Sequence, residues 1–187
     1  MTLHNVVAYT ATGISTYSTL SDSLRHDPCG IWCYLRPVLE HVLENNHLVD
    51  IVRFISDSPA TQYRCRSNFL LFCTQLYDIC NGKLRAATWD YMEAGHGKGA
   101  PDGIGAVLKR TADRLVSSGR DMASADVVFD ALNSTESQIK LFFVTDDEVQ
   151  SASREMITAS AHIKSVSGTM NIRQLHSSTQ NVELLLQ

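Results

Sequence analysis

The stretch LVDIVRFIS, residues 48–56, decides the fold class of this chain. It is short, apolar and rich in β-branched residues, as expected of a strand that is buried on both faces. Helical patterns flank it, because apolar residues recur at helical spacing from Ile31 to Leu43 and again from Phe69 to Tyr77. Strands that alternate with helices indicate an α/β domain. We therefore expect 48–56 to form a central strand between helices.

Turn and cap residues extend this alternation toward the N-terminus and beyond the central strand. Residues 3–9 and 14–20 predict a hairpin around Gly13. Asp27-Pro28 and Ser58-Pro59 each predict the start of a helix, and Pro37 should kink or split the first one. The remaining predicted elements are a strand at 84–92, helices at 104–119 and around 127–132, a strand at 139–144, a helix from the Thr145–Glu148 capping box to about 157, and a β-rich tail.

Composition limits the class of protein. The 187 residues, 44% of them hydrophobic, suit one compact domain with at most a small appendage. The sequence contains no run close to the ~20 apolar residues of a membrane span, and its start does not have the pattern of a secretory signal. Five cysteines, an odd number, favour reduced thiols inside a cell. Cys29 and Cys33 have no second pair that would complete a zinc site.

The net charge of −4 excludes a chain whose whole surface binds nucleic acid. Between Gly82 and Arg120, however, basic residues outnumber acidic ones. This segment forms either a local basic face or an ordinary solvated helix surface.

GHGKGAPDGIG, residues 95–105, combines five glycines with His96, Lys98 and Asp102. A Walker loop is excluded, because Met92 stands where its first glycine should be and Gly99 follows Lys98. The dinucleotide pattern G-x-G-x-x-G is broken as well. Asp102 instead begins a predicted helix, and Asp57 follows the predicted central strand. Two carboxylates in such positions are either a turn residue and a helix cap or ligands of a divalent cation such as Mg²⁺.

Two longer segments resemble a known group of proteins. FISDSPATQYRCRSNFLLF (54–72) and WDYMEAGHGKGAPDGIGAVLKR (89–110) resemble transposon-derived animal proteins that are similar to DDE-type transposases, and SDSLRHDPCGIWCYLRPVL (21–39) is similar to the segment before them. The resemblance implies an RNase H-like mixed sheet flanked by helices. It also implies metal-dependent DNA strand cleavage and transfer in the ancestor.

The same resemblance assigns roles to individual residues. Asp57 corresponds to the second catalytic carboxylate, and Asp102, with Glu93 as the alternative, corresponds to the third. Asp57 and Asp102 would bind Mg²⁺ or Mn²⁺, with their carboxylates about 4–8 Å apart. His96 and Lys98 would face the same cleft and contact phosphate. The residues expected to contact DNA are His96, Lys98, Lys109, Arg110 and Arg64; for Arg64, a plain position on a helix surface is the alternative.

One departure from the family pattern is large. The first catalytic aspartate of such cores lies on their first strand, and this chain is expected to begin at the second; neither Asp22 nor Asp50 has the right position. We expect an incomplete RNase H-like core at 1–120 and a small α+β extension at 121–187. The chain is then a transposase-core fragment, a truncated copy or a domesticated remnant that binds DNA or protein. An intracellular, nuclear location, no membrane partner and possible homo-oligomers are expected.

Overall fold

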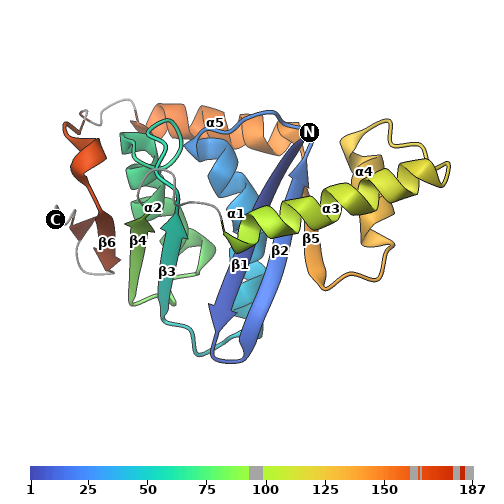
Figure 1. The fold of residues 1–187 in the computed structure, drawn as a ribbon. Helices are drawn as coiled ribbons and strands as arrows, with labels where there is room; N and C mark the ends of the chain where they lie inside the picture. Colours follow the sequence, from blue (N-terminus) through green and yellow to red (C-terminus); the bar gives the residue numbers. More distant parts are fainter. Residues whose placement is uncertain (93–98, 161–163, 165, 179–181, 184–187) are drawn as a thin grey trace.

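The computed structural model describes residues 1–92, 99–160, 164, 166–178 and 182–183. Its strands form two mixed sheets that stand side by side, with helices on both faces (Figure 1). The expected α/β class with mixed sheets flanked by helices is therefore confirmed.

The first sheet has the order β1-β2-β5. β1 (Thr2–Thr10) and β2 (Gly13–Ser21) are antiparallel and joined by a tight turn, in which Gly13 has a φ of 137°. This confirms the predicted hairpin. β5 (Ile139–Val144) also forms as predicted and pairs in parallel with β2.

The second sheet has the order β3-β4-β6-β7. β3 (Ile51–Ser56) is parallel to β4 (Ala86–Tyr91), β6 (Gln174–Ser178) is antiparallel to β4, and β7 (Val182–Glu183) pairs with β6.

The expected central position of the 48–56 strand is wrong. β3 is an edge strand of its sheet, and the exposed fraction of Ile55 is 66%. Only Val52 and Phe54 pack against the core, while Ile51, Arg53 and Ile55 face outward. Composition identified the strand correctly, but apolar residues occur on both of its faces, Val52 and Phe54 on one and Ile51 and Ile55 on the other, so composition could not show that one face is exposed.

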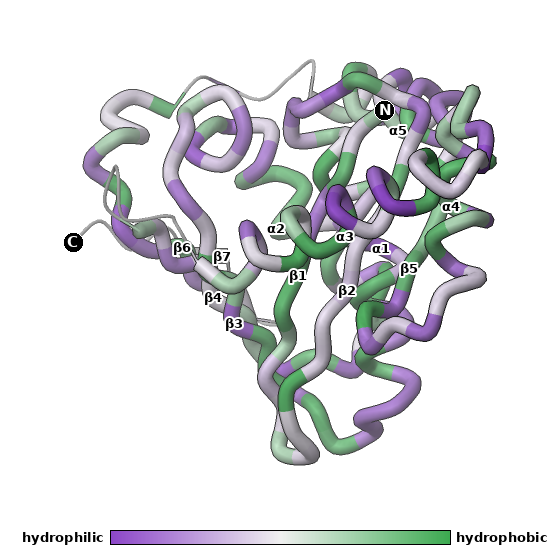
Figure 2. The backbone as a smooth tube through the Cα atoms, turned by 45° about the vertical axis from the view of Figure 1, so that its right-hand side comes forward, coloured by the Kyte–Doolittle hydropathy of each residue, from purple (hydrophilic) through white to green (hydrophobic). Residues whose placement is uncertain are grey.

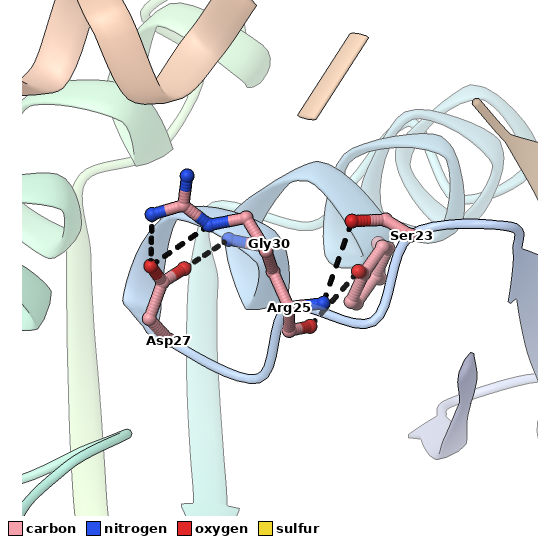
Figure 3. A network of polar contacts seen from close by, with 5 residues as sticks. Ser23, Arg25, Asp27 and Gly30 are labelled. Carbon is pink, nitrogen blue, oxygen red and sulfur yellow. Dashed lines mark hydrogen bonds and ion pairs between the residues drawn. The ribbon is translucent and has the colours of Figure 1, made fainter. Parts of the chain in front are cut away.

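α1 (Pro28–Asn45) begins at a polar cluster (Figure 3). Asp27 Oδ1 accepts a hydrogen bond from Gly30 N at 3.0 Å, and the Arg25 guanidinium pairs with the same carboxylate. α1 continues through Pro37, so of the two expected outcomes, a kink or a split, the split does not occur. Buried residues before and after it, Leu35 and Val38 among them, hold both halves of α1 against the core, which compensates for the lost backbone bond.

α2 (Arg66–Ile79) begins later than predicted. The carbonyl of Pro59 accepts bonds from Gln62 N at 3.1 Å and Tyr63 N at 2.9 Å, which makes 59–65 a compact turn before the helix. The other helices are α3 (Ala100–Ser117), α4 (Ala125–Asn133), α5 (Asp146–Ser160) and the short η1 (Thr169–Asn171). The capping box of α5 is confirmed, since Thr145 N donates to Glu148 Oε2 at 2.7 Å.

Among the described residues, the core consists of a large cluster, a smaller one and a third small group of Tyr34, Val144 and Val149. In the larger cluster, α1 and α2 pack on the second sheet around Trp89, which has an exposed fraction of only 2%. In the smaller one, Ile104 and Leu108 of α3 pack with Leu20 and Leu141 of the first sheet. Hydrophobic residues dominate β5, and they alternate with hydrophilic ones along α3 (Figure 2). α3 therefore lies on its sheet with one apolar face.

The segment after residue 120 contributes to both sheets, because β5 pairs with β2 and β6 pairs with β4. A boundary at residue 120 therefore does not separate two sheets. Among the helices of the described residues, none is long and apolar enough to cross a membrane.

Candidate functional site

Asp57 lies directly after the last residue of β3. The end of this strand is tied to the end of β4, because Met92 N donates to the carbonyl of Ser56 at 2.8 Å. The chain then turns at Pro59, so the Asp57 side chain lies at the carboxyl end of two parallel strands. Open α/β sheets commonly present functional groups at this edge.

Asp102 is the third residue of α3 and caps this helix. Gly99 N donates to Asp102 Oδ2 at 3.3 Å, and Asp102 N donates back to the carbonyl of Gly99 at 3.0 Å. The interpretation of Asp102 as a helix cap is therefore confirmed. The capping bond uses Oδ2, and within the described part of the chain Oδ1 has no hydrogen-bond partner. An exposed carboxylate oxygen thus remains at the start of α3.

The two carboxylates act on each other. Burial raises the pKa of Asp57, and the negative charge of Asp102 raises the pKa further. Like charges have this effect only at short range in a screened environment. The acidic side chains at the end of β3 and the start of α3, which are far apart in sequence, are therefore close enough for the charge of Asp102 to affect Asp57.

Tyr63 belongs to the same site, and the sequence patterns did not predict it. Burial raises the pKa of Tyr63 to about 12, and the charge of Asp57 contributes to this rise. The ring of Tyr63 packs 5.6 Å from that of Trp89. The turn at 59–65 carries the phenol back toward Asp57, a proximity that spacing along the chain does not reveal.

The basic residues that were expected to contact DNA differ in their exposure. Lys109 and Arg110 are exposed on α3. Arg64 is buried, with an exposed fraction of 4%; its Nη1 donates to the carbonyl of Met170 at 2.8 Å and its guanidinium lies over the Tyr91 ring at 5.0 Å. Arg64 thus lacks the exposure of the other two. Glu93, His96 and Lys98 lie outside the described residues.

Asp22 and Asp50, the two aspartates considered for the first catalytic carboxylate, have structural partners. Asp22 Oδ1 accepts a hydrogen bond from Asp146 N at 2.5 Å, at the start of α5. Asp50 forms an exposed ion pair with Arg85 at 3.0 Å. Asp22 thus accepts a bond at the start of α5, and Asp50 belongs to a surface ion pair.

Within the described ranges, no group of three or more histidine, cysteine, aspartate or glutamate side chains could hold a metal ion. Cys29 and Cys33 lie one turn apart in α1, and their hydrogen bond to each other raises the pKa of Cys29. Asp57 and Asp102 supply two carboxylates, one from the end of β3 and one from the start of α3. Mg²⁺ can be held by one or two carboxylates when water and phosphate oxygens complete its coordination.

A family model described as "Domain of unknown function (DUF8701)" matches residues 1–185. The chain belongs to this family. No curated protein and no solved structure matches it. The match covers both candidate carboxylates and both sheets, so the DUF8701 domain comprises the whole arrangement described above.

Proposed function

We propose that this DUF8701 domain derives from the RNase H-like catalytic core of a DDE-type transposase. In this proposal, Asp57 and Asp102 are the second and third carboxylates of a site that bound Mg²⁺ or Mn²⁺. The observation that carries the proposal is the position of Asp57 at the end of β3 and of Asp102 at the start of α3, where the charge of Asp102 adds to burial in raising the pKa of Asp57.

The break between the two sheets supports the same origin. β1 and β3 are edge strands, and Figures 1 and 2 place them next to each other. Such cores carry their first carboxylate on a first strand, which has no counterpart among the described residues. A sheet that had lost one internal strand would have a break of this kind, with unpaired edges on both sides.

In this proposal, the residues of the chain would have the following roles. Asp57 and Asp102 would supply two carboxylates for a divalent ion, whose chemistry is to activate the attacking oxygen and stabilise the leaving one. The amphipathic helix α3, fixed by Ile104 and Leu108, would hold Lys109 and Arg110 on its solvent side for DNA phosphates. Such contacts position DNA without reading its sequence.

A non-catalytic role in binding DNA is the alternative. It is favoured by the presence of only two clustered carboxylates in the described part of the chain, because no group of three or more metal-ligating side chains lies there. Two-metal phosphoryl transfer needs both ions held about 3.5–4 Å apart, and two carboxylates provide few ligands for this.

A nicking assay on supercoiled DNA with Mn²⁺ tests the proposal. The chain should be compared with Asp57→Asn and Asp102→Asn, which keep side-chain size and remove one charge each. We expect little or no cleavage by the wild-type chain. Strong cleavage abolished by either substitution would show that another residue replaces the first carboxylate. Cleavage unchanged by both substitutions would contradict the assignment of this site.

A further inference from the structure

Arg64 is a buried cation without an anionic partner among the described residues. Its exposed fraction is 4%, and it takes part in none of the ion pairs of the described ranges. Charged side chains are seldom buried to this degree unless they are paired, because burying a charge costs much free energy. The contacts of the guanidinium therefore deserve to be followed atom by atom.

The guanidinium is held on one side only. Nη1 donates to the carbonyl oxygen of Met170 at 2.8 Å, and the guanidinium carbon lies 5.0 Å from the centroid of the Tyr91 ring. Nε and Nη2 are buried and have no hydrogen-bond partner within the described part of the chain. These two atoms carry the parallel N–H donors of one edge, with which arginine binds two oxygens of a carboxylate or phosphate at once. The edge suited to bidentate recognition is thus the unpaired one.

Arg64 lies beside the first turn of α2. It precedes Cys65, the N-cap residue of this helix, which makes no side-chain capping bond. Tyr91, the last residue of β4, connects Arg64 to the helix. Its ring lies against the guanidinium, and its hydroxyl donates to the carbonyl of Tyr63 at 3.0 Å. The same carbonyl accepts from Nδ2 of Asn68, in the first turn of α2, at 2.9 Å.

Two general features favour an anion at this place. The start of a helix carries backbone N–H groups and a partial positive charge, and no side chain caps the start of α2. The carboxyl ends of parallel strands, here β3 and β4, are the edge at which open α/β sheets bind ligands. Both features agree with the unpaired donors of Arg64.

The burial of Arg64 limits the size of the anion. A side chain that is 4% exposed cannot reach a phosphate of the DNA backbone. Met170, whose carbonyl binds Nη1, has an exposed fraction of 56%, and η1, the short helix that contains it, has no buried residue. An exposed turn of chain therefore lies beside the guanidinium. An ion of a few atoms can enter when this turn is displaced, whereas a macromolecule cannot.

We propose that Arg64 binds a small oxyanion, a phosphate or a carboxylate, through its Nε and Nη2 donors beside the first turn of α2. The ion accepts two parallel hydrogen bonds and neutralises the buried charge. This site uses neither Asp57 nor Asp102, so it does not depend on the proposed function.

NMR titration of the wild-type chain tests the site directly. The probes are sodium phosphate and sodium acetate, and sodium chloride at the same pH and ionic strength is the reference, because a single-atom anion cannot bridge two donors. The readout is the ¹H–¹⁵N signal of Arg64 Nε, assigned through the side chain from its own backbone amide. We expect a saturable shift with the oxyanions and none with chloride. The oxyanion that binds more tightly identifies the ligand as a phosphate or a carboxylate.

Arg64→Lys separates the parallel donors from the charge, since lysine keeps the charge and lacks the donor pair. Calorimetry should show that its affinity for the tighter oxyanion is about tenfold weaker than that of wild type, as expected for the loss of one hydrogen bond to a charged group. Arg36→Lys, at an exposed position of α1, is the matched control and should bind as wild type does. Circular dichroism should verify folding, and the wild-type titration decides the matter if Arg64→Lys does not fold.

The proposal would be overturned if neither oxyanion shifted the Arg64 Nε signal, or if Arg64→Lys bound both as tightly as wild type. A signal that already has the position of a bonded Nε–H in chloride, and does not change with either oxyanion, would also overturn it. In that case a group of the chain itself would occupy the donors.

Discussion

Burial raises the pKa of Asp57, at the end of β3, and the charge of Asp102, in the first turn of α3, raises it further. The capping bond from Gly99 N holds Asp102 in place, and the bond from Met92 N to Ser56 O holds the strand end before Asp57. A backbone contact within α3 thus supports Asp102, and a backbone contact from the end of β4 supports the strand end before Asp57. The repulsion between them is a cost to folding, which is expected of a functional site rather than of a structural one.

The pH dependence of stability should reveal this cost. Because the pKa of Asp57 is raised in the folded state, the folded chain holds that proton more tightly than the unfolded chain. The contribution of Asp57 to the free energy of unfolding therefore falls as the pH rises from about 4, the ordinary aspartate pKa, through the raised value. Asp57→Asn should melt at the same temperature as wild type below pH 3 and at a higher temperature at pH 7.

Thermal melting followed by circular dichroism between pH 3 and pH 7 measures this difference. Asp121→Asn, at an exposed position, is the control. A lower melting temperature of Asp57→Asn at pH 7 would mean that the charge of Asp57 stabilises the fold.

Two substitutions separate the contribution of the α3 cap to stability from the contribution of the Asp102 charge. Asp102→Asn and Asp102→Ala both remove the negative charge, but only asparagine keeps an oxygen that can accept the bond from Gly99 N. We expect Asp102→Asn to be more stable than Asp102→Ala by about 0.5–1 kcal/mol. Urea unfolding of both variants gives the value, and equal stabilities would show that the cap contributes nothing.

Hydrogen exchange should show that β3 is an edge strand. Asp50 O accepts from Ala86 N at 3.4 Å and Ser56 O accepts from Met92 N at 2.8 Å, so the even-numbered residues of β3 direct their backbone groups toward β4. The amides of Arg53 and Ile55 point to the free edge. We expect them to exchange faster than those of Val52 and Phe54, and slow exchange at Ile55 would instead indicate a further strand beside β3.

DNA binding should depend on the exposed basic residues of α3. Lys109→Ala combined with Arg110→Ala should weaken binding to duplexes of unrelated sequence and reduce the slope of log affinity against log salt by about 2. Fluorescence anisotropy at several salt concentrations measures both effects. Arg36→Ala together with Arg154→Ala, on other helices, is the control, and a larger loss in that pair would place the DNA-binding surface elsewhere.

Local sequence signals predicted the elements whose causes are local. The hairpin depends on Gly13 and its β-favouring neighbours, and the start of α5 depends on the Thr145–Glu148 capping box; both form as predicted. The exposure of β3, the unbroken helix at Pro37 and the late start of α2 depend on which elements pack together. The sequence patterns carried no information about that packing.

The same distinction between local and tertiary causes applies to the candidate site. The positions of Asp57 after a strand and of Asp102 at the start of a helix could be predicted from local patterns, and both are confirmed. The proximity of Tyr63 to Asp57 could not be predicted, because it comes from a turn that folds back toward Asp57. Contacts of this kind leave no fixed spacing in the sequence.

The most direct test of the central claim is Mn²⁺ binding to four proteins: wild type, Asp57→Asn, Asp102→Asn and the double variant. If both carboxylates hold one ion, each single substitution should abolish most of the binding, and the double variant should lose little more than either single one, since partners in one site are not additive. Electron paramagnetic resonance of free Mn²⁺ measures all four affinities. Wild-type affinity retained in both single variants would contradict the claim that Asp57 and Asp102 form a shared divalent-ion site.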